Sequence, residues 1–245
     1  MSAQEQLLLS ALGTAVVLIP ASLLLARYAA RLSWRELGFS PARPIRGAVW
    51  GISLGMMTLL IPAVIGYLLG GFSPSPRSDS LGGEGLGALP GIAIVLPALL
   101  LASLTEELIL RGFLLQLGRR YLGKWGALAT TSILFALLHV GNPAASVLGI
   151  TGAALAGLWL GLAFLESGSL FFATGLHLGW NAASAVVLGL PVSGLELPSL
   201  FRWTTSTSPS VQTLWGGAYG PEEGVVFHVA LGLAAVFCAW LARRL

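Results

Sequence analysis

The stretch that decides the fold is ALPGIAIVLPALLLASLTEELILRGFLLQL, residues 88–117. It contains no charged residue before Glu106, and then Glu106, Glu107 and Arg111 follow within six positions. A helix needs about 20 predominantly apolar residues to cross a hydrocarbon core about 30 Å thick, because each residue rises about 1.5 Å. We therefore predict a transmembrane helix here, with three ionisable side chains inside the membrane.

The composition of the whole chain agrees with a membrane protein. Of the 245 residues, 56% are hydrophobic and only 9% are charged, against roughly 25% charged in an ordinary soluble domain. A chain this apolar cannot stay disordered, and its scattered glycines and prolines show no collagen-like period. Cys238 is the only cysteine, which excludes a disulfide framework and a Cys-rich metal site. We predict an all-α polytopic transmembrane helix bundle, formed by a single domain over residues 1–245.

Seven stretches qualify, or nearly qualify, as membrane spans. The fourth is short, so we expect it to be tilted, kinked or partly buried among its neighbours. We do not expect the first to be a signal peptide, since no Lys or Arg precedes it and a signal peptide begins with a basic region. The predicted spans are 7–26, 46–69, 88–117, 125–141, 145–165, 168–190 and 223–242.

The basic residues predict the orientation of these spans, because cytoplasmic loops of membrane proteins carry an excess of Lys and Arg. Five arginines follow the first span and none precedes it, so we expect the N-terminus outside and the C-terminus in the cytoplasm. A compact chain without organelle-targeting signals favours the bacterial inner membrane. The predicted cytoplasmic residues are Arg27, Arg31, Arg35, Arg43, Arg46, Arg119, Arg120, Lys124, Arg243 and Arg244; Arg77 and Arg202 are expected outside, and Arg111 within a span.

Small residues recur at every fourth position in two of the spans. Such spacing lets helix backbones approach closely in lipid. We expect packing seams inside one bundle rather than a dimer interface, although the sequence does not set the oligomeric state. The two runs are Gly47, Gly51 and Gly55, and Ala153, Gly157 and Gly161.

The ionisable residues of the third span mark a functional site, since each costs roughly 2.5–3.5 kcal/mol to place in a membrane. Glu107 and Arg111 are four residues apart and lie on one helical face, which predicts an ion pair. Glu106 is rotated away by about a quarter turn and is the less neutralised carboxylate. The alternative is a purely structural buried pair with an additional charge near a helix end.

Two further pairs at the same spacing follow along the chain. Phe135 and His139 end the fourth span, and His177 and Asn181 lie in the sixth. Counting about 1.5 Å per residue from the cytoplasmic ends puts Glu106, His139 and His177 at depths of about 14 to 21 Å. We therefore expect three helices to present these side chains at one level. His228, alone in the last span, is expected to be a packed residue with one hydrogen bond.

These three patterns, Glu-Glu-x-x-x-Arg at 106–111, Phe-x-x-x-His at 135–139 and His-x-x-x-Asn at 177–181, resemble the motifs of the CAAX protease and bacteriocin-processing family. Its eukaryotic members are the type II CAAX prenyl endopeptidases, and its bacterial members are also called Abi proteins. The resemblance covers a core of about residues 88–190. It implies an intramembrane glutamate-dependent endopeptidase that acts on membrane-anchored or lipidated peptides within the lipid bilayer, with no nucleic-acid partner.

The resemblance also implies a role for each motif residue. Glu106 would activate water, with His139 helping to hold it. His177 and Asn181 would stabilise the oxyanion, while Glu107, Arg111 and Phe135 would support the site. No cofactor is expected on this route.

Other functions compatible with the same residues stay open. A zinc-dependent version would use Glu106, His139 and His177 as ligands. The absence of a His-Glu-x-x-His motif favours the metal-free route, and Asn181 is a poor zinc ligand but a good oxyanion donor. A non-catalytic immunity or scaffold protein, or a proton-coupled transporter in which the Glu and His side chains relay protons, would also contain intramembrane ionisable residues. The lack of internal repeats counts against the transporter.

Overall fold

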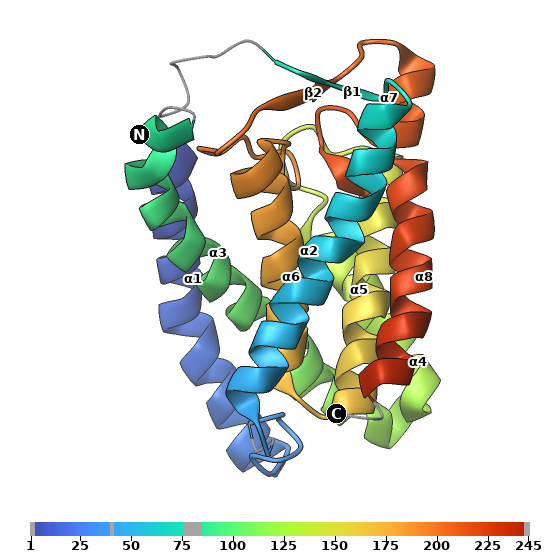
Figure 1. The fold of residues 1–245 in the computed structure, drawn as a ribbon. Coiled ribbons are helices and arrows are strands. Elements are labelled where there is room, and N and C mark those ends of the chain that lie inside the picture. The colour runs from blue at the N-terminus through green and yellow to red at the C-terminus, as the bar shows by residue number, and fades with distance from the viewer. Residues whose placement is uncertain (1–2, 40–41, 76–84, 243–245) are drawn as a thin grey trace.

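The computed structural model describes residues 3–39, 42–75 and 85–242, and helices make up most of them. The long helices pack side by side in one bundle, and a small antiparallel sheet crosses one end (Figure 1). The elements are α1 (Ala3–Leu24), η1 (Leu25–Ala29), α2 (Pro44–Leu68), β1 (Phe72–Pro74), η3 (Gly85–Ala88), α3 (Leu89–Glu107), η4 (Leu108–Leu115), α4 (Gln116–Leu138), α5 (Val147–Ser167), α6 (Leu170–Ala182), η5 (Ala183–Leu188), β2 (Trp203–Thr205), α7 (Pro209–Trp215), η6 (Pro221–Glu223) and α8 (Val225–Ala242).

The predicted all-α membrane class is confirmed. Five helical stretches in the described chain are long and apolar enough to cross a membrane, and Val225–Cys238 is a shorter apolar helix. The seven-span count stays a prediction, as does the direction of the termini. The five stretches are Glu5–Ala29, Pro44–Leu68, Gly85–Leu138, Val147–Ser167 and Leu170–Leu188.

The longest of these stretches contains a break where the sequence predicts one. Gly85–Leu138 has 54 residues, which would measure about 81 Å as a straight helix against a hydrocarbon core of about 30 Å. Gly123 interrupts it with φ 69° and ψ 177°, a conformation that glycine adopts without steric cost. A Cβ on Gly118 would lie 3.1 Å from Ala127 Cβ, so the segments before and after the break pack against each other.

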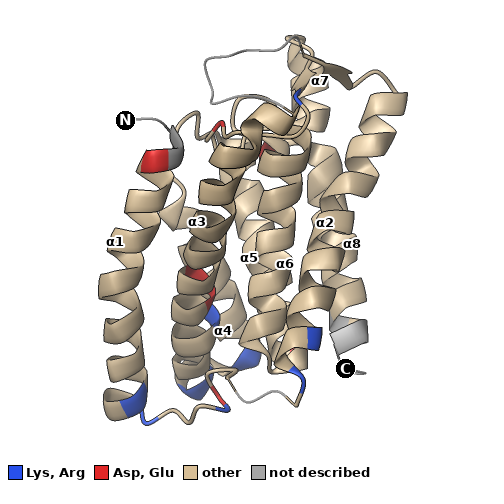
Figure 2. Ribbon diagram, turned by 60° about the vertical axis from the view of Figure 1, so that its left-hand side comes forward, with Lys and Arg blue, Asp and Glu red and all other residues tan. Residues whose placement is uncertain are grey.

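Lys and Arg residues gather at one end of the bundle, where α1 finishes and α2 begins (Figure 2). Arg202 precedes β2, and β2 lies at the opposite end (Figure 1). Basic residues on one side agree with the predicted cytoplasmic face, although the orientation itself is not tested by the fold. The predictions for Arg77, Arg243 and Arg244 lie outside the described residues.

Glycines bring α2 and α6 into backbone contact. A Cβ on Gly51 would lie 2.9 Å from Leu176 N and 3.0 Å from Gly175 Cα, and a Cβ on Gly175 would lie 3.2 Å from Gly51 Cα. On α5, a Cβ on Gly157 would lie 2.9 Å from Ser132 Cα of α4. The prediction of packing seams within one bundle is therefore confirmed, and the α2–α6 seam positions the helix that carries His177.

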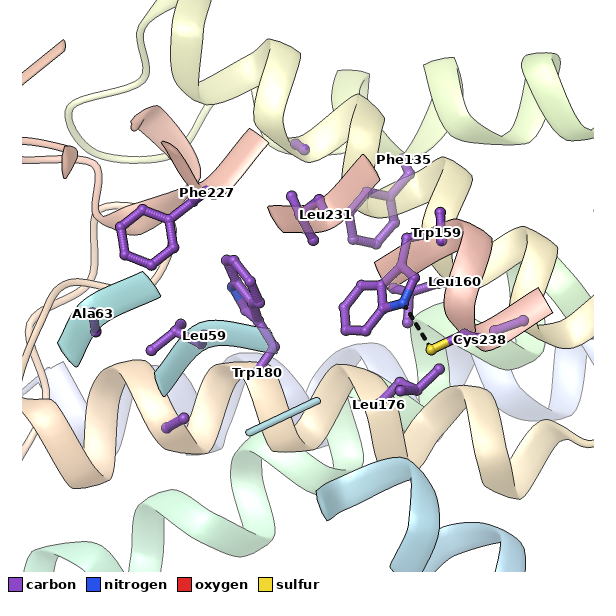
Figure 3. Packing of buried hydrophobic residues seen from close by; sticks show 14 of the residues in the cluster. Leu59, Ala63, Phe135, Trp159, Leu160, Leu176, Trp180, Phe227, Leu231 and Cys238 are labelled. Atoms are coloured by element: carbon purple, nitrogen blue, oxygen red, sulfur yellow. Dashed lines mark hydrogen bonds between the residues drawn. The ribbon is translucent and has the colours of Figure 1, made fainter. Parts of the chain in front are cut away.

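Aromatic side chains fill the core between α5, α6 and α8 (Figure 3). Trp180 of α6 makes edge contacts with Trp159 of α5, at 6.2 Å between ring centroids, and with Phe227 of α8, at 6.1 Å. Trp159 Nε1 donates to Cys238 Sγ at 3.4 Å. His228 Nε2 donates to the backbone carbonyl of Glu222 at 2.8 Å, which confirms its predicted structural role.

The α2–α6 seam makes Gly51→Ala a sharp test of this packing. Alanine normally stabilises a helix relative to glycine by about 1 kcal/mol, and Gly232→Ala in α8, where nothing lies within 4 Å of the added Cβ, should show that gain or no change. At Gly51 the backbones must separate, so we expect a loss of about 1–3 kcal/mol, measured as a lower melting temperature in detergent. Equal melting temperatures for the two variants would contradict the seam.

Candidate active site

The three predicted motifs come from α3, α4 and α6 and meet inside the bundle. Glu106 and Glu107 are the last two residues of α3, and Arg111 lies in the π-helical segment η4 that continues it. Phe135 lies in the last turn of α4, and His139 is the C-cap residue of that helix. His177 and Asn181 lie one turn apart on α6.

Arg111 and Glu107 form a fully buried ion pair. Arg111 Nη1 donates to Glu107 Oε1 at 2.9 Å, and both side chains have 0% exposure. Arg111 Nη2 also donates to the carbonyl of Gly157 in α5 at 3.1 Å, and the guanidinium lies 4.8 Å from the centroid of the Phe135 ring. The ion pair predicted from the i,i+4 spacing is therefore present, and it links η4 to α4 and α5.

His177 contacts both carboxylates of the motif. Its Nδ1 is 3.0 Å from Glu107 Oε1, and its Nε2 is 4.0 Å from Glu106 Oε2. The i,i+4 spacing predicts Arg111 as the partner of Glu107, and in the structure the same Glu107 oxygen is shared between Arg111 and His177. Because Nδ1 faces a carboxylate, which accepts a hydrogen bond, Glu107 orients the ring so that Nε2 points toward Glu106.

His139 is oriented by the backbone of its own helix. Its Nδ1 donates to the Phe135 carbonyl at 2.8 Å, since a carbonyl oxygen can only accept. In the neutral ring this places the proton on Nδ1 and leaves Nε2 as an acceptor. The Phe135 ring lies between the two histidines, 4.7 Å from His139 and 5.7 Å from His177 between centroids. Phe135 thus packs against both rings and against Arg111.

Glu106 differs from its neighbour Glu107 in its exposure and in making no ion pair with Arg111. Its side chain is 32% exposed, whereas that of Glu107 is fully buried. Its Oε2 atom is buried and has no hydrogen-bond partner within the described chain. A carboxylate that neither an arginine nor a hydrogen bond occupies is available to a water molecule or a substrate.

A cavity of about 380 Å³ connects the predicted catalytic residues. Glu106, His139, His177 and Asn181 all line it, whereas Glu107 and Arg111 lie behind its wall. The remaining lining is mostly apolar. Several lining residues come from α1, namely Leu7, Ser10, Ala11, Thr14 and Leu18.

Part of this lining is not predicted by the sequence motifs. Nothing in the sequence links the first span to the site, because its residues form no polar pattern. Nor do the motifs include Asn142, Ser193 and Glu222, which line the cavity from connecting segments and from η6. Two adjacent glutamates at 222 and 223, directly before an apolar helix, are the sequence feature that could have indicated a carboxyl group in the cavity.

The comparison with protein families finds one match in the region that carries the three motifs. Residues 88–183 match the family described as "Type II CAAX prenyl endopeptidase Rce1-like". The predicted family resemblance is confirmed over these residues. The match and the apolar helices together support an intramembrane endopeptidase in general, in an integral multi-pass membrane protein. No curated protein and no solved structure gives a significant match.

The alternative zinc site would need Glu106, His139 and His177 to converge on one metal ion. A catalytic zinc ion needs three protein ligands, each within about 2.0–2.2 Å of the metal for nitrogen and oxygen donors. Within residues 3–39, 42–75 and 85–242, no three His, Cys, Asp or Glu side chains gather closely enough to hold a metal ion. Glu106, His139 and His177 do not fit a metal site in this arrangement.

The shared Glu107 oxygen predicts unequal stability effects for the two neighbouring glutamates. Glu107→Ala leaves Arg111 buried without its counter-charge, and removing one partner of a buried pair typically costs about 3–5 kcal/mol. Glu106→Ala removes a partly exposed carboxylate that makes no hydrogen bond through Oε2, so its cost should be much smaller. Thermal unfolding of both variants in one detergent measures the difference, and equal losses would contradict the assignment of Arg111 to Glu107.

Proposed function

We propose that this protein hydrolyses peptide bonds of membrane-associated or lipidated substrates, with Glu106 as the residue that activates water. One observation carries the proposal: Glu106 faces the cavity and lies 4.0 Å from His177 Nε2, and Glu107 holds the His177 ring in place. Glu106 makes no ion pair with an arginine or lysine in the described chain. The family match supports the general activity, and the role of each residue is our inference.

Glu106 is suited to act as a general base. In the proposed step, Glu106 takes a proton from a water molecule as the water oxygen bonds to the substrate carbonyl carbon. The C–N bond then breaks, and the proton held by Glu106 passes to the departing amine. A positioned acid or base of this kind typically accelerates such a reaction about 10²–10⁴-fold. His139, which lines the same cavity with Nε2 as its available acceptor, would hold the water beside Glu106.

The α6 residues would stabilise the negative charge that develops on the carbonyl oxygen. Asn181 lines the cavity, and its side-chain amide can donate a hydrogen bond at any pH. His177 can donate from Nε2 only when that nitrogen carries a proton, because Nδ1 is already directed at Glu107. One well-placed donor at such a position contributes about 2.7–4 kcal/mol to catalysis.

The cavity wall favours a substrate that reaches the site from the membrane. The lining is mostly apolar, and α1 contributes one side of it. A hydrocarbon chain or an apolar peptide segment can bind such a wall, while the scissile bond lies against Glu106. We infer a membrane-anchored or lipidated peptide as the substrate and the bacterial inner membrane as the location.

Glu106→Ala and His139→Ala should abolish cleavage of a membrane-anchored peptide by the protein reconstituted in liposomes. We expect losses of about 10²–10⁴-fold, with the melting temperature close to that of the wild type for Glu106→Ala. Glu196→Ala serves as the matched control, since this exposed carboxylate does not line the cavity, and it should cleave normally. Full activity in either the Glu106 or the His139 variant would defeat the role assigned to that residue.

A further inference from the structure

A third buried carboxyl group, Glu222, lines the cavity that contains Glu106. The Glu222 residue is 5% exposed and lies in η6, the short turn before α8. Its Oε1 accepts a hydrogen bond from Trp180 Nε1 at 3.3 Å. Its Oε2 is buried and lacks a hydrogen-bond partner in the described chain. None of the steps proposed above uses this residue.

The turn that carries Glu222 is held firmly by two neighbouring helices. His228 of α8 donates to the Glu222 carbonyl at 2.8 Å. A Cβ on Gly152 of α5 would collide with the same carbonyl, so the α5 backbone packs directly on the turn. Trp180, which holds the carboxyl group, is itself packed between Trp159 and Phe227 (Figure 3). The packing of α5, α6 and α8 therefore fixes the position of Glu222.

The described lining of the cavity contains two carboxyl groups but no lysine or arginine. Glu106 and Glu222 both line it and both have a buried oxygen without a hydrogen-bond partner, whereas no Lys or Arg is among its described lining residues. Arg111, the nearest buried cation in the motif, is paired with Glu107 behind the wall. A low-dielectric cavity with carboxylates and no fixed cation attracts positively charged groups and repels anions.

The raised pKa of Glu222 agrees with the absence of a lysine or arginine from the described cavity lining. Burial raises the pKa of Glu222 to about 7, because hydrogen bonds from backbone NH groups and from Trp180, together with the charge of His177, only partly offset the loss of solvent. A bound cation would favour the ionised form and lower this pKa. Other titratable groups on the surrounding elements are Glu106, His139, His177, Tyr219, Glu223 and His228.

We propose that Glu222 forms a cation-binding subsite of the cavity, which takes the ammonium or guanidinium group of a basic residue in the substrate. The inference rests on the proposed function, because it assigns the cavity to a peptide. Trp180 holds one carboxylate oxygen, and the other oxygen faces the bound cation. The subsite would make the protein selective for substrates that carry a basic residue at one defined position relative to the scissile bond.

Peptide binding tests the subsite without depending on hydrolysis. Fluorescent peptides that carry one lysine, moved through each position in turn, are compared with peptides that carry norleucine at the same position. Fluorescence anisotropy measures Kd at pH 8 for the Glu106→Gln protein in phosphatidylcholine nanodiscs, whose choline headgroups carry no N–H donor that could imitate a lysine ammonium. At one position we expect the lysine peptide to bind at least about tenfold more tightly, equivalent to about 1.4 kcal/mol.

Adding Glu222→Gln should reduce this lysine-to-norleucine ratio to about one, while the Kd of the norleucine peptide stays unchanged. The unchanged norleucine binding shows that the variant is folded. Glu223→Gln removes a charge from the adjacent residue, which does not line the cavity, and should keep the tenfold ratio. A ratio that survives Glu222→Gln, or the absence of any lysine preference at every position, would overturn the proposal.

The pH dependence gives a second measurement with a defined sign. Because the pKa of Glu222 is raised to about 7, the carboxylate is present at pH 8 and mostly protonated at pH 5.5. The lysine preference should therefore fall toward one at pH 5.5, and the Glu222→Gln variant should show no such change. A wild-type protein that cleaves no peptide would defeat the proposed function but would leave both binding ratios measurable.

Discussion

The buried ion pair between Glu107 and Arg111 is the interaction on which the site depends. Neither charge has access to water, so each must be satisfied by protein groups. Arg111 contacts Glu107, the Gly157 carbonyl and the Phe135 ring, and the same Glu107 oxygen contacts His177 Nδ1. The ion pair thus joins α3 and η4 to α4 and α5 through Arg111 and to α6 through Glu107. The neighbouring Glu106 contributes to none of these contacts and is left facing the cavity.

The different roles of Glu106 and Glu107 explain why two adjacent glutamates are present. A single carboxylate that paired with Arg111 would be occupied and would make a poor base. A single carboxylate that did not pair with Arg111 would not itself be held in place, and so could not orient His177. With two, one residue holds the structure and the other is available for chemistry. The exposures agree with these two roles, since the Glu107 side chain is 0% exposed and that of Glu106 is 32% exposed.

The sequence predicted what depends on spacing within one helix. The i,i+4 interval of Glu107 and Arg111, the separation of Glu106 from that pair, and the small-residue seams all follow from helical periodicity. The predicted spans 88–117 and 125–141 leave a gap between them, and the structure places the helix break in that gap, at Gly123. The contact of His177 with Glu107 could not be predicted, because it depends on how α3 and α6 are rotated about their own axes. Glu222 and the α1 wall reach the cavity only through tertiary packing.

The central claim is that Glu106 activates water directly rather than attacking the substrate itself, and the origin of the oxygen in the product tests it. A single turnover, with protein in excess over a membrane-anchored peptide, is carried out in water labelled with ¹⁸O, and mass spectrometry of the new C-terminal carboxylate follows. The account predicts one ¹⁸O atom in the product of this first turnover and none in Glu106. An unlabelled product together with ¹⁸O in the Glu106 side chain would show a covalent intermediate and contradict the account.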